Sequence, residues 1–187
     1  MAQAQEPVRI ALRKLWSDHV FWTREYIRAA IQDGGDADAA AARLLRNQDD
    51  IGDAIVPYYG NDAGAKLTDL LKQHIMIAVE LVKAAKGGDD DRFATEDTKW
   101  TQNAEEIAGF LASANPNWPR GDVMDLLAQH LKLTKDETVA VLQKDYDTAV
   151  QRFDDIYNEI LVLADALYDG LVAQFPEKFR TPMAAAA

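Results

Sequence analysis

Apolar residues along the chain recur with the spacing of amphipathic helices. Between Leu67 and Ala85 they return every three or four residues, which is the pattern of a helix that buries one face. His74 occupies the middle of this apolar line, at a position where leucine would be expected. Two further stretches place a histidine at the equivalent point of a similar line, His19 in the first and His130 in the third. The chain has no other histidine, so the pattern predicts an internal repeat with one buried histidine in each copy.

Turn and cap signals divide the chain into about six predicted helices. Glycine pairs or a proline end the first three helices. The run Thr134-Lys135-Asp136-Glu137 matches a capping box, which predicts the start of the last helix and leaves a short helix around His130. The acidic run 89–91 is predicted to be a solvated linker. The predicted helices span about 8–32, 37–57, 67–86, 95–113, 119–133 and 134–174.

No stretch alternates apolar and polar residues long enough to predict a β-strand. The sequence therefore predicts an all-α fold, a single-domain up-and-down bundle of about six helices built from three pseudo-repeated helical hairpins. The bundle is expected to cover residues 8–180, between flexible tails at 1–7 and 181–187. In that topology the first helices of the three hairpins run parallel, so we expect the three histidines to share one level.

The returning helix of each hairpin carries polar residues that are predicted to face the histidines. Asn47 and Asn103 lie on the apolar lines of their helices. A pair of acids stands just before an isoleucine in all three returning helices. Neighbouring residues of a helix point ~100° apart, so only one acid of each pair lies at the edge of the buried face. These edge acids are Asp50, Glu106 and Asp155.

Imidazoles with nearby carboxylates are a common ligand set for Zn, Fe or Mn. We therefore predict a site for a divalent metal or a small-molecule ligand in the bundle core. The predicted metal ligands are His19, His74, His130, Asp50, Glu106 and Asp155, and the residues predicted to orient them are Asn47 and Asn103. An enzyme built on such a site would use water activation or oxygen chemistry at the metal.

Two other interpretations of the pattern stay open. A polar layer satisfied inside each hairpin would fix the register of the repeats in a non-enzymatic interaction or scaffold protein. A histidine among aromatic residues such as Trp16 and Trp100 would suit a haem or small-molecule sensor. The glutamate-x-x-histidine signature of di-iron bundles and the histidine-glutamate-x-x-histidine signature of zinc proteases are both missing.

Charge and composition narrow the range of partners. The 187-residue chain has a formal net charge of -11, which disfavours nucleic acids and anionic membranes as partners. It has no cysteine, so disulfides and thiolate metal sites are excluded. The N-terminal residues lack the apolar core of a signal peptide, and a cytoplasmic location is expected. The sequence carries no signal for the oligomeric state.

Several motifs together resemble one group of proteins. They are Leu15-Trp16 followed by His19, and then RLLRNQDDIG, YYG, LLKQHI and ANPNW. The pattern is similar to a group of small uncharacterised bacterial helical-bundle proteins, over about residues 10–179. Some members are labelled glycosyltransferase or acetylglutamate kinase, activities that need strands and phosphate-binding loops, which this sequence lacks. The resemblance implies a helical bundle and no particular activity or site residue.

Overall fold

The computed structural model describes residues 6–179, which form six long α-helices and one short 3-10 helix. No β-strand occurs in this part of the chain, so the predicted all-α bundle is confirmed. The helices are α1 (Glu6–Ile31), α2 (Ala37–Tyr59), α3 (Asn61–Gly87), α4 (Asp90–Ala114), α5 (Arg120–Leu142), α6 (Tyr146–Gln174) and η1 (Pro176–Phe179).

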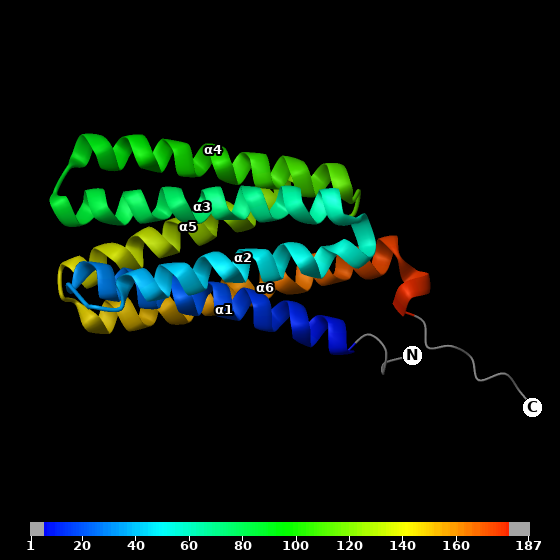
Figure 1. Cartoon of the computed structure of the whole chain (residues 1–187), viewed down its shortest axis with the longest axis horizontal. Helices are drawn as coiled ribbons and strands as arrows, with labels where there is room; N and C mark the ends of the chain where they lie inside the picture. The colour runs from blue at the N-terminus through cyan, green and yellow to red at the C-terminus, as the bar shows by residue number, and fades with distance from the viewer. Residues whose placement is uncertain (1–5, 180–187) are drawn as a thin grey trace, which may run out of the picture.

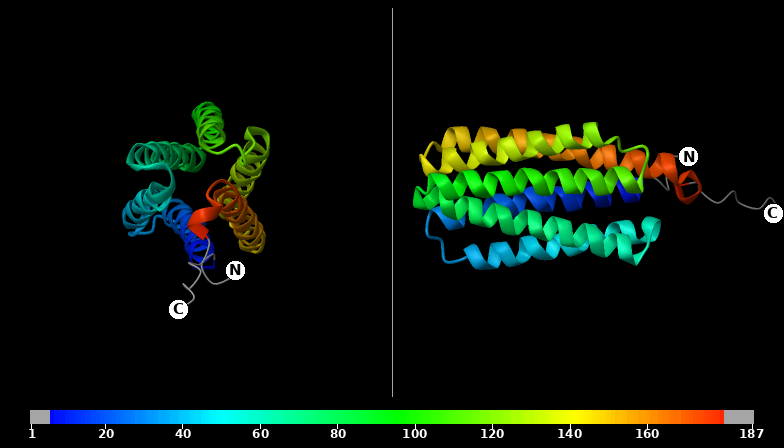
Figure 2. Two further views of the ribbon diagram at one scale, coloured as in Figure 1. Left: turned by 90° about the vertical axis from the view of Figure 1, so that its right-hand side faces the viewer. Right: turned by 90° about the horizontal axis from the view of Figure 1, so that it is seen from above.

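The six helices form a closed ring (Figures 1 and 2). Each helix packs against the helices that precede and follow it in the chain, and α6 packs against α1. Short connections reverse the direction of the chain at every step, so α1, α3 and α5 run parallel to one another. These three helices also contact each other. Residues on their inner faces therefore meet at the axis of the bundle.

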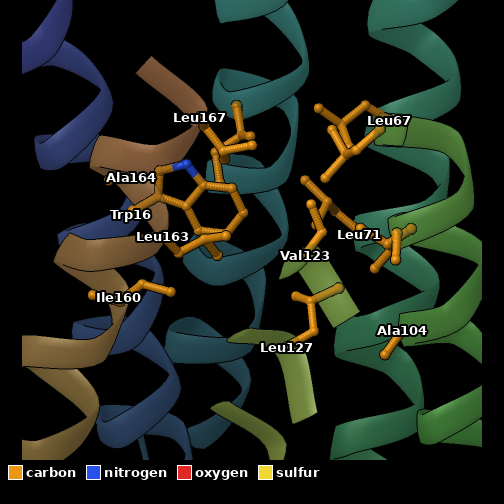
Figure 3. Packing of buried hydrophobic residues seen from close by; sticks show 14 of the residues in the cluster. Trp16, Leu67, Leu71, Ala104, Val123, Leu127, Ile160, Leu163, Ala164 and Leu167 are labelled. Atoms are coloured by element: carbon orange, nitrogen blue, oxygen red, sulfur yellow. The ribbon is translucent and has the colours of Figure 1, made fainter. Parts of the chain in front are cut away.

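An apolar core runs along this axis. Figure 3 shows Trp16 of α1, Leu71 of α3, Leu127 of α5 and Leu163 of α6 meeting in one buried cluster. An apolar cavity of about 30 Å³ lies in this core, lined by leucine and isoleucine side chains together with two tryptophans. Burying these side chains is the main stabilising term of such a bundle.

The first two hairpins differ from the sequence prediction at their helix boundaries. Helix α2 continues through Pro57 to Tyr59, and Gly60 alone, at φ 85°, separates it from α3. A proline in the last turn removes only one hydrogen bond, so it does not end the helix there. The acidic run 89–91 is no linker: the Asp89 side chain accepts a hydrogen bond from the Arg92 amide and caps α4. The other two acids lie in the first helical turn, where the helix dipole favours negative charge.

The predicted boundary between the two helices of the third hairpin is wrong by more than one helical turn. Helix α5 runs without a break through the predicted capping box, and α6 starts only at Tyr146, where the Asp145 side chain caps it. The Thr134 hydroxyl donates to the His130 carbonyl one turn earlier, so it satisfies a helix-interior group and not a helix start. Glu137 is buried against α1, where it faces Arg24.

The ends of the bundle were predicted only in part. Helix α1 begins at Glu6, inside the predicted N-terminal tail of 1–7. The rest of that tail and the predicted tail at 181–187 lie outside the described residues. No helix within residues 6–179 is long and apolar enough to cross a membrane.

Helices α2 and α3 approach closely where two glycines face each other. A Cβ atom on Gly52 would lie 2.7 Å from the Gly64 carbonyl oxygen and 1.9 Å from Thr68 Oγ1. A Cβ atom on Gly64 would likewise lie 2.9 Å from the Gly52 carbonyl oxygen. The absence of side chains at both positions therefore sets the distance between the first and second hairpins.

Candidate functional site: a buried layer of three histidines

The three histidines come together in the core, one from each inner helix. His19 of α1, His74 of α3 and His130 of α5 are only 3%, 4% and 4% exposed. All three line one internal cavity of about 20 Å³. The rings of His19 and His130 have centroids 5.7 Å apart, whereas His74 packs against Trp100 at a centroid distance of 5.0 Å. The prediction that the histidines share one level of the bundle is confirmed.

Two histidines are hydrogen-bonded through Nδ1 to the returning helix of their own hairpin. His74 Nδ1 lies 2.9 Å from Asn103 Oδ1, and His130 Nδ1 lies 3.1 Å from Glu159 Oε2. In both pairs the partner follows the histidine by 29 residues.

Gln48 holds the equivalent place in the first hairpin, 29 residues after His19. It is fully buried, and its side chain lies close enough to favour protonation of His19. The approach is looser than in the other two pairs, because neither His19 Nδ1 nor Gln48 Oε1 completes a hydrogen bond. The second and third hairpins thus set a carboxamide or carboxylate oxygen beside the Nδ1 atom of their histidine, and the first places Gln48 near His19.

These partners determine which ring nitrogen carries the proton. The Asn103 amide nitrogen donates to the Leu70 carbonyl at 3.1 Å, which turns its oxygen toward His74. An amide or carboxylate oxygen only accepts, so Nδ1 of His74 donates the hydrogen bond. A neutral imidazole has one N–H, and its Nε2 atom therefore keeps a lone pair.

The other two histidines also have a buried oxygen as the available partner. The Glu159 carboxylate accepts from His130 Nδ1. The Gln48 amide nitrogen donates to the Leu44 carbonyl and to Asn47 Oδ1, so its oxygen is the atom left for His19. The closed Nδ1 bonds of His74 and His130 leave Nε2 as the ring atom without a hydrogen bond, whereas His19 Nδ1 closes no bond with Gln48.

The threonine hydroxyl groups that line the cavity are not free to donate to these lone pairs. None of the three Nε2 atoms has a hydrogen bond within residues 6–179. The hydroxyls of Thr23, Thr134 and Thr138 also line the cavity, but each donates to a backbone carbonyl one turn earlier. The Trp100 indole N–H is buried there and bonds to no described residue.

Burial keeps His19 and His74 neutral. It lowers the pKa of His74 to about 3, and proximity to His130 acts in the same direction. Burial also holds the pKa of His19 well below its usual value, again helped by the other two histidines. Both imidazoles are therefore unprotonated at neutral pH, which is the form that ligates metals.

The carboxylates predicted as metal ligands lie elsewhere. Asp50 and Glu106 are exposed, and Asp50 faces Arg43 at 3.7 Å. Asp155 is half-exposed and pairs with Arg152 at 2.8 Å. The prediction placed these acids at the edge of the buried face, but at that edge solvent and arginines satisfy their charges.

Of the two asparagines predicted to orient the ligands, only Asn103 contacts a histidine. Asn103 holds His74 as expected, whereas Asn47 donates to the Leu15 carbonyl and accepts from the amide of Gln48. The sequence interpretation missed Gln48 and Glu159 as partners. The common separation of 29 residues was the signal that could have found them.

The described residues contain no preformed metal site. Within residues 6–179, no group of three or more His, Cys, Asp or Glu side chains is spaced as a ready-made metal site. Comparisons with protein-family models, with curated proteins and with solved structures gave no match. The resemblance to bacterial helical-bundle proteins therefore stays a prediction.

Proposed function

We propose that this protein is a small metal-binding helical bundle that holds a divalent ion through Nε2 of His19, His74 and His130. The observation that carries the proposal is the set of three buried histidines around one cavity, whose Nε2 atoms have no hydrogen bond within residues 6–179. A bound ion that accepts the Nε2 lone pairs would stabilise the layer by binding the folded protein.

The surroundings of the rings are those of metal-ligating histidines. Such histidines donate their other ring N–H to an oxygen, which fixes the tautomer and raises the basicity of the ligating nitrogen. Asn103 and Glu159 accept these bonds, and Gln48 is placed to do so. The Glu159 carboxylate also supplies a negative charge that offsets part of the charge of a buried cation.

Binding of one ion requires a ring to move, because within residues 6–179 no three His, Cys, Asp or Glu side chains are already spaced to hold a metal. Two histidines on one metal have ring centroids roughly 5–6 Å apart, given metal–nitrogen distances of ~2.1 Å. His19 and His130 already meet this distance at 5.7 Å. His74 packs against Trp100, so its ring has to turn toward the other two when the ion binds.

Three imidazole ligands favour Zn or Fe over Mn, which prefers oxygen ligands. A site with three histidines leaves a coordination position for water, and the cavity of about 20 Å³ has room for one. A metal in this site would supply Lewis acidity and an activated water. The chain itself would orient the ligands and exclude bulk solvent.

We also infer that the three hairpins are copies of one unit. The separation of 29 residues between each histidine and its oxygen partner supports this, since it is the same in three places. Duplication of a hairpin would bring three equivalent imidazoles to one axis without separate evolution of each ligand.

A structural role for the layer is the competing function. The Nδ1 bonds of His74 and His130 close inside their own hairpins, and these bonds would fix hairpin register without any metal. This function predicts that metals leave the stability of the protein unchanged.

The decisive experiment is elemental analysis of the native protein, followed by melting curves with chelator and with added Zn or Fe. Metal at one hundred times its dissociation constant would add about 2.7 kcal/mol of stability. We expect His74→Ala to abolish this gain. Asp50→Ala serves as the matched control and should keep the gain, because Asp50 lies outside the layer. A metal-free protein whose melting temperature ignores chelator and both metals would refute the proposal.

A further inference from the structure

A second polar pocket lies between α1, α5 and α6, near the end of the bundle where α5 turns into α6. Its volume is about 50 Å³, and Arg24, Arg28 and Glu137 supply its charged groups. Tyr146 and three aliphatic residues complete the lining. This pocket is separate from the cavity that the histidines share.

The charged groups in this pocket are poorly satisfied by one another. Glu137 is only 2% exposed, and its Oε1 atom has no hydrogen-bond partner among the described residues. Arg24 Nε lies 3.7 Å from that oxygen, which is too far for a hydrogen bond. The Arg24 side chain is 14% exposed and its guanidinium lies 4.2 Å from the Phe153 ring centroid.

The pocket has more positive than negative groups, because two guanidinium groups lie beside one carboxyl group. Arg24 makes no hydrogen bond within residues 6–179, and Arg28 neither bonds nor ion-pairs there. Two cations therefore face one carboxyl group. Guanidinium groups present a rigid fork of N–H donors that matches planar oxyanions.

We propose that Arg24, Arg28 and Glu137 form a binding site for a small carboxylate-type oxyanion. The two guanidinium groups donate N–H hydrogen bonds to this anion, and the protonated Glu137 carboxyl group donates an O–H hydrogen bond to it. The ligand sits where the guanidinium donors lack partners. A neutral carboxyl group and a carboxylate share one proton in a strong hydrogen bond, whereas two carboxylates repel each other.

Binding at this site is coupled to proton uptake. Burial raises the pKa of Glu137 to about 7, against the opposing effect of Arg24 and Arg28. From α6, Tyr146 lines the pocket as the remaining titratable group. Because Glu137 must be protonated to accept the anion, affinity falls as pH rises through its pKa. The apparent affinity for a carboxylate is expected to be about tenfold higher at pH 6 than at pH 8.

Formate is the probe, and the Arg24 side-chain Nε–Hε signal in ¹H–¹⁵N spectra is the measurement. We expect a saturable shift of this signal, tighter at pH 6 by about tenfold. Glu137→Gln cannot ionise, so it should bind formate equally at both pH values. Titrating phosphate in parallel separates planar from tetrahedral anions, and weaker binding of phosphate is expected.

Arg24→Gln should abolish the shift of neighbouring signals, whereas Arg46→Gln, an exposed arginine outside the pocket, removes the same charge and should leave binding unchanged. A formate response without saturation, an equal response at both pH values in the wild-type protein, or tighter binding of phosphate than of formate would overturn the proposal. The Glu137→Gln variant retains a packed side chain, so it keeps the test valid if Arg24→Gln fails to fold.

Discussion

At the level of single residues, three buried histidines and the polar side chains beside them form one layer of the core. The positions of His19, His74 and His130 on apolar lines were enough to place them in the core. Their partners Gln48 and Glu159 were missed, because an apolar line shows which face is buried but not which buried oxygen meets which nitrogen. That distinction depends on helix rotation by a fraction of a turn.

Glu137 gives the clearest residue-level prediction for pH dependence. Its pKa is raised from 4.5 to about 7 in the folded protein, so folding favours the protonated form. The stability that this group contributes is fully present below pH 4.5 and is lost as pH rises through 7. Glu137→Gln removes the titration. Its stability relative to wild type should therefore increase by about 3 kcal/mol between pH 4.5 and pH 8.

Denaturant unfolding at several pH values measures this difference. The exposed Glu106→Gln variant is the matched control, and its stability should follow wild type across the same range. A constant difference between Glu137→Gln and wild type at all pH values would show that Glu137 is not held in its neutral form.

At the scale of helices, local signals gave the existence of each element but not all boundaries. The sequence Thr134-Lys135-Asp136-Glu137 has the composition of a helix start, yet it lies inside α5. Tertiary contacts decide the outcome here, because Glu137 faces Arg24 across the helix interface and Thr134 bonds its own helix. The glycines of α2 and α3 are equally ambiguous in the sequence, since only the packed pair reveals a close approach.

Gly52→Ala is therefore expected to destabilise the protein. The added Cβ atom would lie 1.9 Å from Thr68 Oγ1 and 2.7 Å from the backbone oxygen of Gly64, so the helices must separate. Overpacking of this kind costs about 1–3 kcal/mol. Chemical denaturation compares this variant with wild type.

Gly109→Ala is the matched control, because Gly109 lies inside α4 and a Cβ atom there meets nothing within 4 Å. It should stabilise the protein by about 0.5–1 kcal/mol through helix propensity. Equal effects of the two substitutions would contradict the close approach of α2 and α3.

At the scale of the whole molecule, the closed ring of helices explains why one chemical layer can form. The up-and-down order makes α1, α3 and α5 parallel, and their mutual contacts bring one histidine from each to the axis. The sequence predicted this arrangement because short connections leave few other topologies. It did not predict the pocket of Arg24, Arg28 and Glu137, since a cavity depends on how side chains from several helices fill a common space.

Metal binding by this layer requires an unprotonated Nε2 atom on each of the three histidines that line the cavity. A long-range ¹H–¹⁵N correlation spectrum of the metal-free protein at neutral pH reports the protonated nitrogen of each imidazole directly. The account predicts Nδ1–H tautomers for His19, His74 and His130, and a shift of all three Nε2 signals on addition of one equivalent of zinc. An Nε2–H tautomer at any of these histidines, or Nε2 signals that do not respond to zinc, would contradict it.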